Sequence, residues 1–311
     1  MLDTLDALQL PGLASFSFTF HTGFIEAHII ELNLRHLIIF LRKTVGLKEL
    51  AIRVDETSCN LNLGFLFMHL GTLEYLEKLS LMMPPLDRFD ASHPDILFPI
   101  ISFIRGHRDK LLDITLKSNA MFVFGTPTDS EVHCWPWRLL DAINFESLVR
   151  LDVGAVPFNW LVEFLRSHRR TLHHLTLSAD VFPFLPDRLL SLDRELSDSP
   201  LGLSRIREVS LTLRSLTPRL LVYILKHFPA AQHLAISYLT TPPPSTFYEQ
   251  LRKMLIEEGV ATSLERTFEF TTVRIRGIVE GPELLQFIYQ ALQETIGGIV
   301  CQGDFVDDED E

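Results

Sequence analysis

Residues 172–177 read Leu-His-His-Leu-Thr-Leu, an L-x-x-L-x-L segment that predicts a short strand with alternate residues in a core. The preceding residues 164–171 read Phe-Leu-Arg-Ser-His-Arg-Arg-Thr, which is typical of the end of a helix. The same pair occurs at residues 103–116, where Phe-Ile-Arg-Gly-His-Arg-Asp-Lys leads into Leu-Leu-Asp-Ile-Thr-Leu. One helix–strand unit cannot bury both of its apolar faces alone. The repetition therefore predicts a stacked solenoid.

The L-x-x-L-x-L template matches nine times when other apolar residues are allowed in place of leucine. The fourth positions, which are the expected strand centres, are Phe16, Leu50, Leu79, Ile114, Leu151, Leu175, Val209, Leu234 and Val273. Their intervals are irregular, and several exceed the roughly 20–29 residues of tight leucine-rich repeats. Because solenoid repeats stack on their neighbours, we expect these strands to pair in parallel and in chain order.

Helical periodicity alternates with the strand pattern. The apolar spacing i, i+1, i+4, i+5, i+8 occurs in segments that begin at Ile96, Trp160, Leu220 and Leu284. Residues 23–44 are apolar on more than one side, so we expect a long helix that is covered on two faces. The two periods together predict an α/β fold, a leucine-rich-repeat-like solenoid with a parallel sheet on the concave side and helices outside. We expect a single domain over 1–303, with about nine irregular repeats.

Charge and composition exclude several classes of function. The formal net charge is −12, and the acidic segment 304–311, which we expect to be a disordered tail, supplies about half of it. No basic stripe is present, so we expect neither nucleic-acid nor membrane binding. The opening residues carry no basic region of a signal peptide, and the 3 cysteines are too few for a disulfide framework. We therefore expect a cytoplasmic or nuclear protein.

Four segments rich in Pro, Asp, Ser and Thr follow predicted strands, at 84–94, 119–137, 180–200 and 239–246. Since each leaves a strand end, all four should emerge on one rim of the solenoid. Residues Trp135 and Trp137 lie in the second segment, and tryptophan is enriched at binding hot spots. Two interpretations are open for this pair. The rings either anchor a partner or fold back and seal the edge of the solenoid.

The outward positions of the predicted strands carry charges of alternating sign. The residues that precede four successive strand centres are Glu49, Lys78, Asp113 and Arg150. In a parallel sheet they become lateral neighbours, about 4.8 Å apart. They are either a binding strip or a ladder in which the charges satisfy one another. We predict that a partner contacts Asp113, Arg150 and Asp152 on the concave face, together with the two tryptophans at the rim.

No motif for catalysis, cofactor binding or metal binding is recognisable. The pair His133-Cys134 with His93 and His107 lacks the spacing of a zinc site. Glycine-rich phosphate loops and the G-x-S-x-G motif do not occur in the sequence. We therefore expect no enzyme activity, no cofactor and no metal.

The helix ends Phe-[Ile/Leu]-Arg-x-His-Arg before L-x-x-L-x-L, and residues 8–16, Leu-Gln-Leu-Pro-Gly-Leu-Ala-Ser-Phe, resemble the leucine-rich-repeat region of fungal F-box-like proteins, especially those of mushroom-forming fungi. In that family the repeats recruit a target, and an N-terminal F-box docks onto the adaptor of a cullin–RING ubiquitin ligase. The first predicted strand segment begins at Leu13, so we recognise no F-box and assign no docking residue.

The resemblance implies a non-enzymatic protein–protein interaction module, the target-recognition part of a ubiquitin-ligase substrate receptor. Its partner would be a protein of unknown identity, with a cullin–RING ligase component as a further partner if an F-box exists elsewhere. Two alternatives stay open from the residues alone. One is a small hydrolase or metal enzyme with an unrecognised site, and the other is an orphan fragment without a selected partner.

Overall fold

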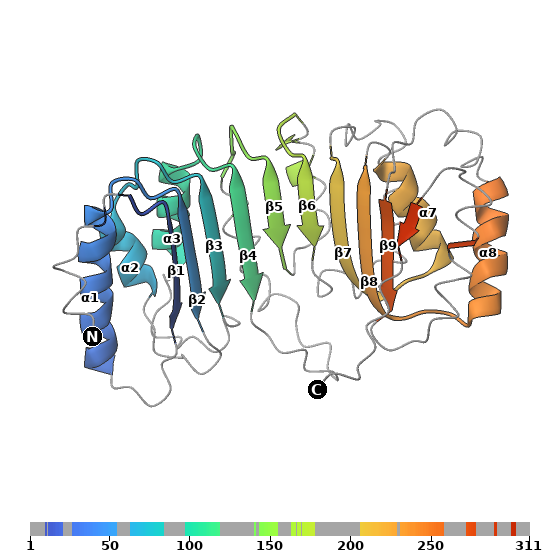
Figure 1. Cartoon of the computed structure of the whole chain (residues 1–311), viewed down its shortest axis with the longest axis horizontal. Helices are drawn as coiled ribbons and strands as arrows, with labels where there is room; N and C mark the ends of the chain where they lie inside the picture. The colour runs from blue at the N-terminus through green and yellow to red at the C-terminus, as the bar shows by residue number, and fades with distance from the viewer. Residues whose placement is uncertain are drawn as a thin grey trace. The chain divides into compact units, whose positions relative to one another are not determined.

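The chain divides into two compact units, Met1–Trp160 and Leu161–Glu311. A computed structural model describes residues 10, 12–20, 27–54, 63–83, 97–118, 140, 143–154, 163–165, 167–168, 170–177, 206–228, 231–257, 272–277, 289–290 and 300–302. Both units combine parallel strands with helices, so the predicted α/β class is confirmed (Figure 1). Three of the four predicted rim segments, at 84–94, 119–137 and 180–200, lie outside the described residues, as does the acidic tail.

The described part of the first unit contains five strands that pair in parallel and in chain order (Figure 1). These strands are β1 (Ser15–Phe20), β2 (Glu49–Val54), β3 (Lys78–Met83), β4 (Asp113–Ser118) and β5 (Arg150–Val153). The helices are α1 (Ala27–Lys43), α2 (Leu63–Leu70) and α3 (Leu97–Gly106). The predicted strand centres are register partners, in the series Phe16, Leu50, Leu79, Ile114 and Leu151. The predicted order, direction and register are confirmed within this unit.

Alternate residues of these strands form the core. In β2, Leu50, Ile52 and Val54 are buried, whereas the residues between them are partly exposed. The helices supply the other half of the core, since the rings of Phe67 in α2 and Phe103 in α3 lie 5.0 Å apart and both are buried. Because successive side chains of a strand point to opposite faces, the remaining residues form a second face. We call it the open face of the first unit, and its residues in β2–β5 are Glu49, Ala51, Arg53, Lys78, Ser80, Met82, Asp113, Thr115, Lys117, Arg150 and Asp152.

The long helix α1 differs in one respect from the expectation. Its buried side contains Leu34, Leu37 and Leu41, as a helix packed on a core requires. The second apolar side is exposed rather than covered, since Ile29, Leu32 and Ile39 are 41%, 51% and 40% exposed. Helix α1, which follows β1, therefore has an exposed apolar surface.

The second unit repeats the arrangement. Its described strands are β6 (His174–Leu177), β7 (Glu208–Ser215), β8 (His233–Thr240), β9 (Thr272–Gly277) and β10 (Val300–Gln302), with helices α7 (Pro218–His227) and α8 (Pro244–Glu257). They pair in parallel in chain order, with Leu175, Val209, Leu234 and Val273 in register. Strand β10 was not expected from the sequence. The prediction that residues 239–246 form the fourth rim segment is wrong in its bounds, because these residues include the end of β8 and the start of α8.

Helix α7 shows how the sequence sets an element boundary. Thr217 has extended backbone geometry, and its hydroxyl accepts a hydrogen bond from the backbone N–H of Leu220 at 3.2 Å. Pro218 follows in the first turn, where its missing N–H costs nothing. The Thr-Pro pair therefore caps and starts the helix.

The substitution Leu175→Ala tests the buried row of the second unit. Leu175 is 1% exposed in β6, so the change should lower the free energy of unfolding by about 2–5 kcal/mol. The neighbouring change Thr176→Ala removes an outward side chain and serves as the control. Chemical denaturation followed by circular dichroism measures both, and equal midpoints for the two variants would contradict the assigned register.

Candidate functional site

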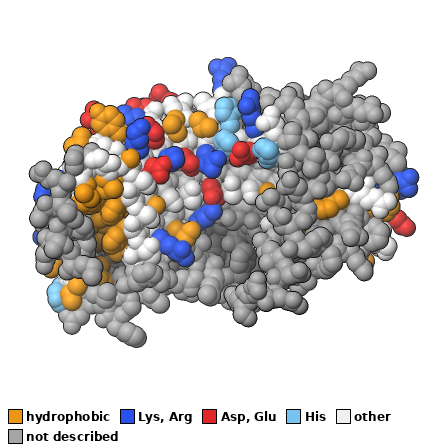
Figure 2. Space-filling view, viewed as in Figure 1, with side chains coloured by type: hydrophobic (Ala, Val, Ile, Leu, Met, Phe, Trp, Pro, Cys, Tyr) orange, Lys and Arg blue, Asp and Glu red, His pale blue; other side chains and the backbone are white. Residues whose placement is uncertain are grey.

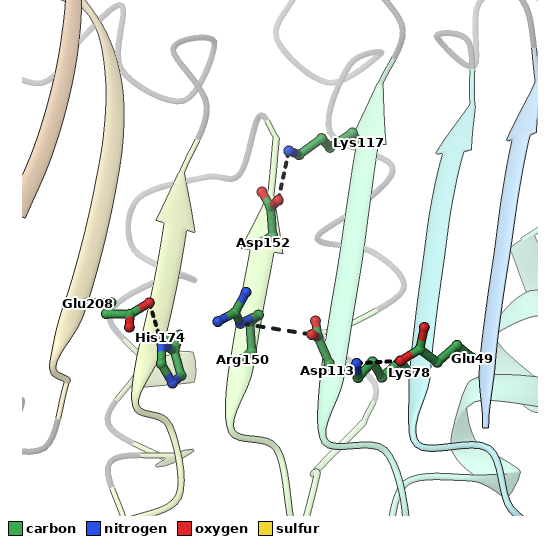
Figure 3. A network of polar contacts seen from close by, with 8 residues as sticks. All are labelled: Glu49, Lys78, Asp113, Lys117, Arg150, Asp152, His174 and Glu208. Carbon is green, nitrogen blue, oxygen red and sulfur yellow. Dashed lines mark ion pairs between the residues drawn. The ribbon is translucent and has the colours of Figure 1, made fainter. Parts of the chain in front are cut away.

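The open face of the first unit carries a row of charges from four adjacent strands (Figure 2). We call Glu49, Lys78, Asp113 and Arg150 the charged ladder, because each is the register partner of the next. Lys78 forms an ion pair with Glu49, and Arg150 Nε lies 3.9 Å from Asp113 Oδ2 (Figure 3). The predicted lateral proximity of Asp113 and Arg150 is therefore confirmed.

Two further residues of opposite charge lie nearer the ends of the same strands. Lys117 Nζ in β4 lies 2.7 Å from Asp152 Oδ2 in β5 (Figure 3). The predicted partner-binding residues Asp113, Arg150 and Asp152 thus lie together on the open face. The other two predicted residues, Trp135 and Trp137, lie outside the described residues.

The two ends of the charged ladder differ in their electrostatics. A hydrogen bond from Lys78 holds the pKa of Glu49 below its usual range, and the same contact raises the pKa of Lys78. The pKa of Asp113 is shifted in the opposite direction to that of Glu49. Burial raises the pKa of this carboxyl, although Arg150 and Lys78 act to lower it. Glu49 is therefore well compensated by its neighbour, and Asp113 is not.

Asp152 also lacks full compensation, because one of its two carboxylate oxygens has no hydrogen-bond partner. Its Oδ2 contacts Lys117, while its buried Oδ1 has no hydrogen-bond partner. A buried acceptor without a donor costs about 1–3 kcal/mol. The charge of Asp152 also contributes to the raised pKa of Asp113, which shows that the two carboxylates influence each other. Asp152 therefore has one buried oxygen without a donor, and Asp113 is a partly buried carboxyl that its basic neighbours compensate only in part.

The positions between the charges are small. Ala51, Ser80 and Thr115 occupy the middle outward positions of β2, β3 and β4 and are register partners of one another. All three are partly exposed. Small side chains in a row let another chain approach the sheet closely, and the flanking charges then determine which chemistry is favoured there.

The second unit has a single comparable contact among its described outward positions. His174 Nδ1 in β6 lies 2.7 Å from Glu208 Oε2 in β7, and the two residues are register partners (Figure 3). Both side chains are partly exposed. This pair supports the strand register, although the buried Nδ1 of His174 has no partner in hydrogen-bond geometry.

A buried histidine at the end of α3 bonds to the segment between α2 and β3. The Nδ1–H of His107 donates to the backbone oxygen of Phe103 at 2.7 Å, and Nε2 accepts from the backbone N–H of Leu73 at 2.9 Å. A carbonyl can only accept and an amide N–H can only donate, so the ring is neutral with its proton on Nδ1. Burial lowers the pKa of His107, which favours this neutral form. We call this contact the histidine clamp.

The histidine clamp was not predicted, although the sequence contains a signal for it. The spacing Phe-x-x-x-His occurs at residues 24–28, 65–69, 89–93, 103–107 and 164–168, and the structure describes both residues of the pair in the helices at 65–69, 103–107 and 164–168. In all three helices the histidine Nδ1 contacts the phenylalanine carbonyl, at 2.9, 2.7 and 2.9 Å respectively. The histidine rings also lie 4.0–4.4 Å from the phenylalanine rings. Burial lowers the pKa of His168, as it does for His107.

Both nitrogens of His107 bond to the backbone, so this residue is not available as a metal ligand. The other members of the imagined zinc site, His93, His133 and Cys134, lie outside the described residues. Within the described part of the chain, no group of three or more His, Cys, Asp or Glu side chains is arranged to hold a metal ion.

Comparisons with known proteins leave the family open, because no family model matches the chain and no curated protein matches it. None of the helices in the described ranges is long and apolar enough to cross a membrane.

The histidine clamp predicts a stability that depends on pH. Unfolded histidine has a pKa of about 6.5, and the folded pKa of His107 is lower, so the unfolded state binds the proton more readily. The contribution of the clamp is therefore complete above about pH 6.5 and is lost as the pH falls through the folded pKa. Thermal unfolding between pH 8 and pH 5 should show the loss.

The variant His107→Gln should flatten this pH dependence, although His168 will retain part of it. The matched control is His69→Gln, since His69 makes the same contact to Phe65 on an exposed surface. A pH profile of the melting temperature that is the same for both variants would contradict the role of His107.

Proposed function

We propose that this chain is a non-enzymatic protein-interaction module, built as a leucine-rich-repeat-like solenoid whose open strand face receives the partner. The support is the regular pairing of the strands in each unit, together with the repeated alternation of buried and outward residues. The observation that carries the proposal is the acidic pair Asp113 and Asp152, whose need for cations and donors is only partly met on the open face.

The chemistry of the pair indicates the kind of partner. A carboxylate that is partly removed from water and poorly compensated gains from an approaching cation or N–H group. An arginine can donate two parallel hydrogen bonds to one carboxylate, and lysine supplies a compact charge. The partner would therefore present a basic side chain over β4 and β5. Its backbone would approach over the small side chains of Ala51, Ser80 and Thr115.

The charges that already pair have a separate role in this proposal. Glu49 and Lys78 form an ion pair with each other, and an exposed pair of this kind contributes little to stability. Their mutual contact leaves little attraction for a third group. Recognition would thus depend on the Asp113–Asp152 end of the open face and not on the Glu49–Lys78 end.

The role suggested by the sequence resemblance is narrower. We propose that the open face recruits the target in a ubiquitin-ligase substrate receptor of the F-box type, in which the F-box is supplied elsewhere. Trp135 and Trp137 would then anchor the target at the rim, as they follow β4 and precede β5 in the sequence.

The acidic pair can be tested without knowing the natural partner. A random peptide library selected on the immobilised chain should be enriched in arginine and lysine. The double variant Asp113→Asn with Asp152→Asn should bind the selected peptides at least about tenfold more weakly, which corresponds to about 1.4 kcal/mol. Titration of a labelled selected peptide by fluorescence polarisation measures the loss.

The matched control is Glu49→Gln, which removes one charge from the same open face at a well-compensated position. Its affinity for the selected peptides should stay within about twofold of the parent chain, a change of about 0.4 kcal/mol. Equal losses in the control and the double variant would indicate a general effect of charge and contradict a site at Asp113 and Asp152.

The rim anchor has its own test. Once a protein partner is captured by proximity labelling, Trp135→Ala with Trp137→Ala should weaken its binding by more than about 2 kcal/mol, the usual scale of a hot spot. Calorimetry with the purified partner measures the change. Unchanged affinity with an unchanged circular dichroism spectrum would assign the two rings to sealing the edge of the solenoid.

A further inference from the structure

Strand β1 is an edge of the sheet, and its composition differs from that of its neighbours. It reads Ser-Phe-Ser-Phe-Thr-Phe and pairs only with β2 among the described strands. At the outward positions of β2–β5 charged residues are frequent, but β1 has Ser15, Ser17 and Thr19 there. Edge strands usually carry charges, proline or a bulge that prevent pairing with another chain. Strand β1 has no charge and no proline.

The free hydrogen-bonding groups of β1 can be identified from its pairing with β2. The backbone N–H of Glu49 donates to the oxygen of Ala14 at 2.9 Å. In a parallel ladder alternate residues face the same neighbour, so Ala14, Phe16 and Phe18 direct their backbone groups to β2. Ser15, Ser17 and Thr19 direct theirs to the opposite side, which is the edge of the sheet.

The apolar surface continues from β1 onto α1. The rings of Phe16 and Phe18 are partly exposed, and the ring of Phe16 lies 5.2 Å from that of Phe40 in α1. The exposed apolar side of α1 contains Ile29 and Leu32. Figure 2 shows hydrophobic side chains gathered at this end of the sheet, beyond the charged ladder. An edge with free backbone groups and an adjoining apolar surface is a typical site for strand addition.

We infer that β1 pairs with the β1 strand of a second copy of this chain, in an antiparallel dimer with twofold symmetry centred on Ser17. With Ser17 opposite itself, Ser15 lies opposite Thr19 and Phe16 lies opposite Phe18. The phenylalanines of both copies then share one face of the joined sheet, and the serines and threonines share the other. An isologous interface requires this kind of self-complementary pattern.

The absence of charge on β1 makes a second copy of the same strand a compatible occupant, because the pairing brings no like charges together. The chain has a formal net charge of −12, so two copies repel each other at most positions. The neutral β1 removes this obstacle at the edge. The last strand in the strand order, β10, spans only Val300–Gln302. It is too short to pair with the whole of β1 from another copy. Short edge strands are one way in which proteins prevent such pairing.

The mass of the chain in solution tests the dimer. Light scattering after size exclusion should give twice the chain mass of 35.6 kDa at high concentration, with dissociation on dilution. The variant Ser17→Pro removes one edge N–H without removing a hydrogen bond to β2, so it should be monomeric. Ser17→Thr retains that N–H and should remain dimeric.

A single cysteine tests the register even if Ser17→Pro fails to fold. Ser17→Cys should form a disulfide-linked dimer on mild oxidation, because the two copies of residue 17 lie opposite each other. Ser15→Cys should not, because its two copies are separated by four residues along the strand, or roughly 13 Å, and a disulfide needs Cα atoms within about 7 Å. Non-reducing electrophoresis measures both against the unchanged chain, which has its own 3 cysteines.

Several outcomes would overturn the inference. A monomer at every concentration would mean that another segment of the chain or a different protein occupies the edge. Larger assemblies that grow with concentration would indicate head-to-tail association instead of a closed dimer. Equal crosslinking at positions 15 and 17 would exclude the antiparallel register centred on Ser17.

Discussion

Burial of alternate strand residues in continuous rows is the constraint on which the rest of the structure depends. In the first unit Leu50, Leu79, Ile114 and Leu151 are adjacent and almost fully buried. A shift of one residue in any strand would bring charged side chains into the core and leucines onto the surface. The buried rows therefore fix the positions of the outward residues as well. The proximity of Asp113 and Asp152 on the open face follows from this register.

Polar contacts add to the packing of the buried rows. The histidine clamp satisfies a backbone N–H that precedes β3 with a side chain from the end of α3. A buried N–H without a partner is costly. The clamp therefore connects the segment that precedes β3 to the end of α3. The charged ladder acts on the opposite side of the sheet, where exposed pairs contribute little to stability. The clamp thus serves mainly the fold.

Much of the sheet could be predicted because L-x-x-L-x-L places two buried residues at a spacing of two within each strand. The same pattern failed at β10, whose three residues are too few to show an alternation. The richness of residues 239–246 in proline, serine and threonine predicts a loop, although α8 begins at Pro244. Proline is also favoured in the first turn of a helix, and there the structure uses it.

The candidate site was only partly accessible from the sequence. The lateral order of Glu49, Lys78, Asp113 and Arg150 follows from strand register alone. The difference between a compensated Glu49 and an uncompensated Asp113 depends on burial and on distances between side-chain atoms, which the sequence does not contain. For the same reason the contact of His107 with Leu73 could not be predicted, since the two residues are 34 positions apart.

The histidine clamp also limits how a chain of this kind can evolve. Repeat arrays change length by duplication or deletion of whole units, which is harmless when each unit is complete in itself. Here the ring of His107 follows α3 and the N–H of Leu73 precedes β3, so two successive helix–strand segments of the first unit share the contact. A deletion between them would leave a buried donor and a buried acceptor unmatched at the new junction. Residues 73 and 107 are therefore constrained together, whereas the outward positions of the strands are not tied to this contact.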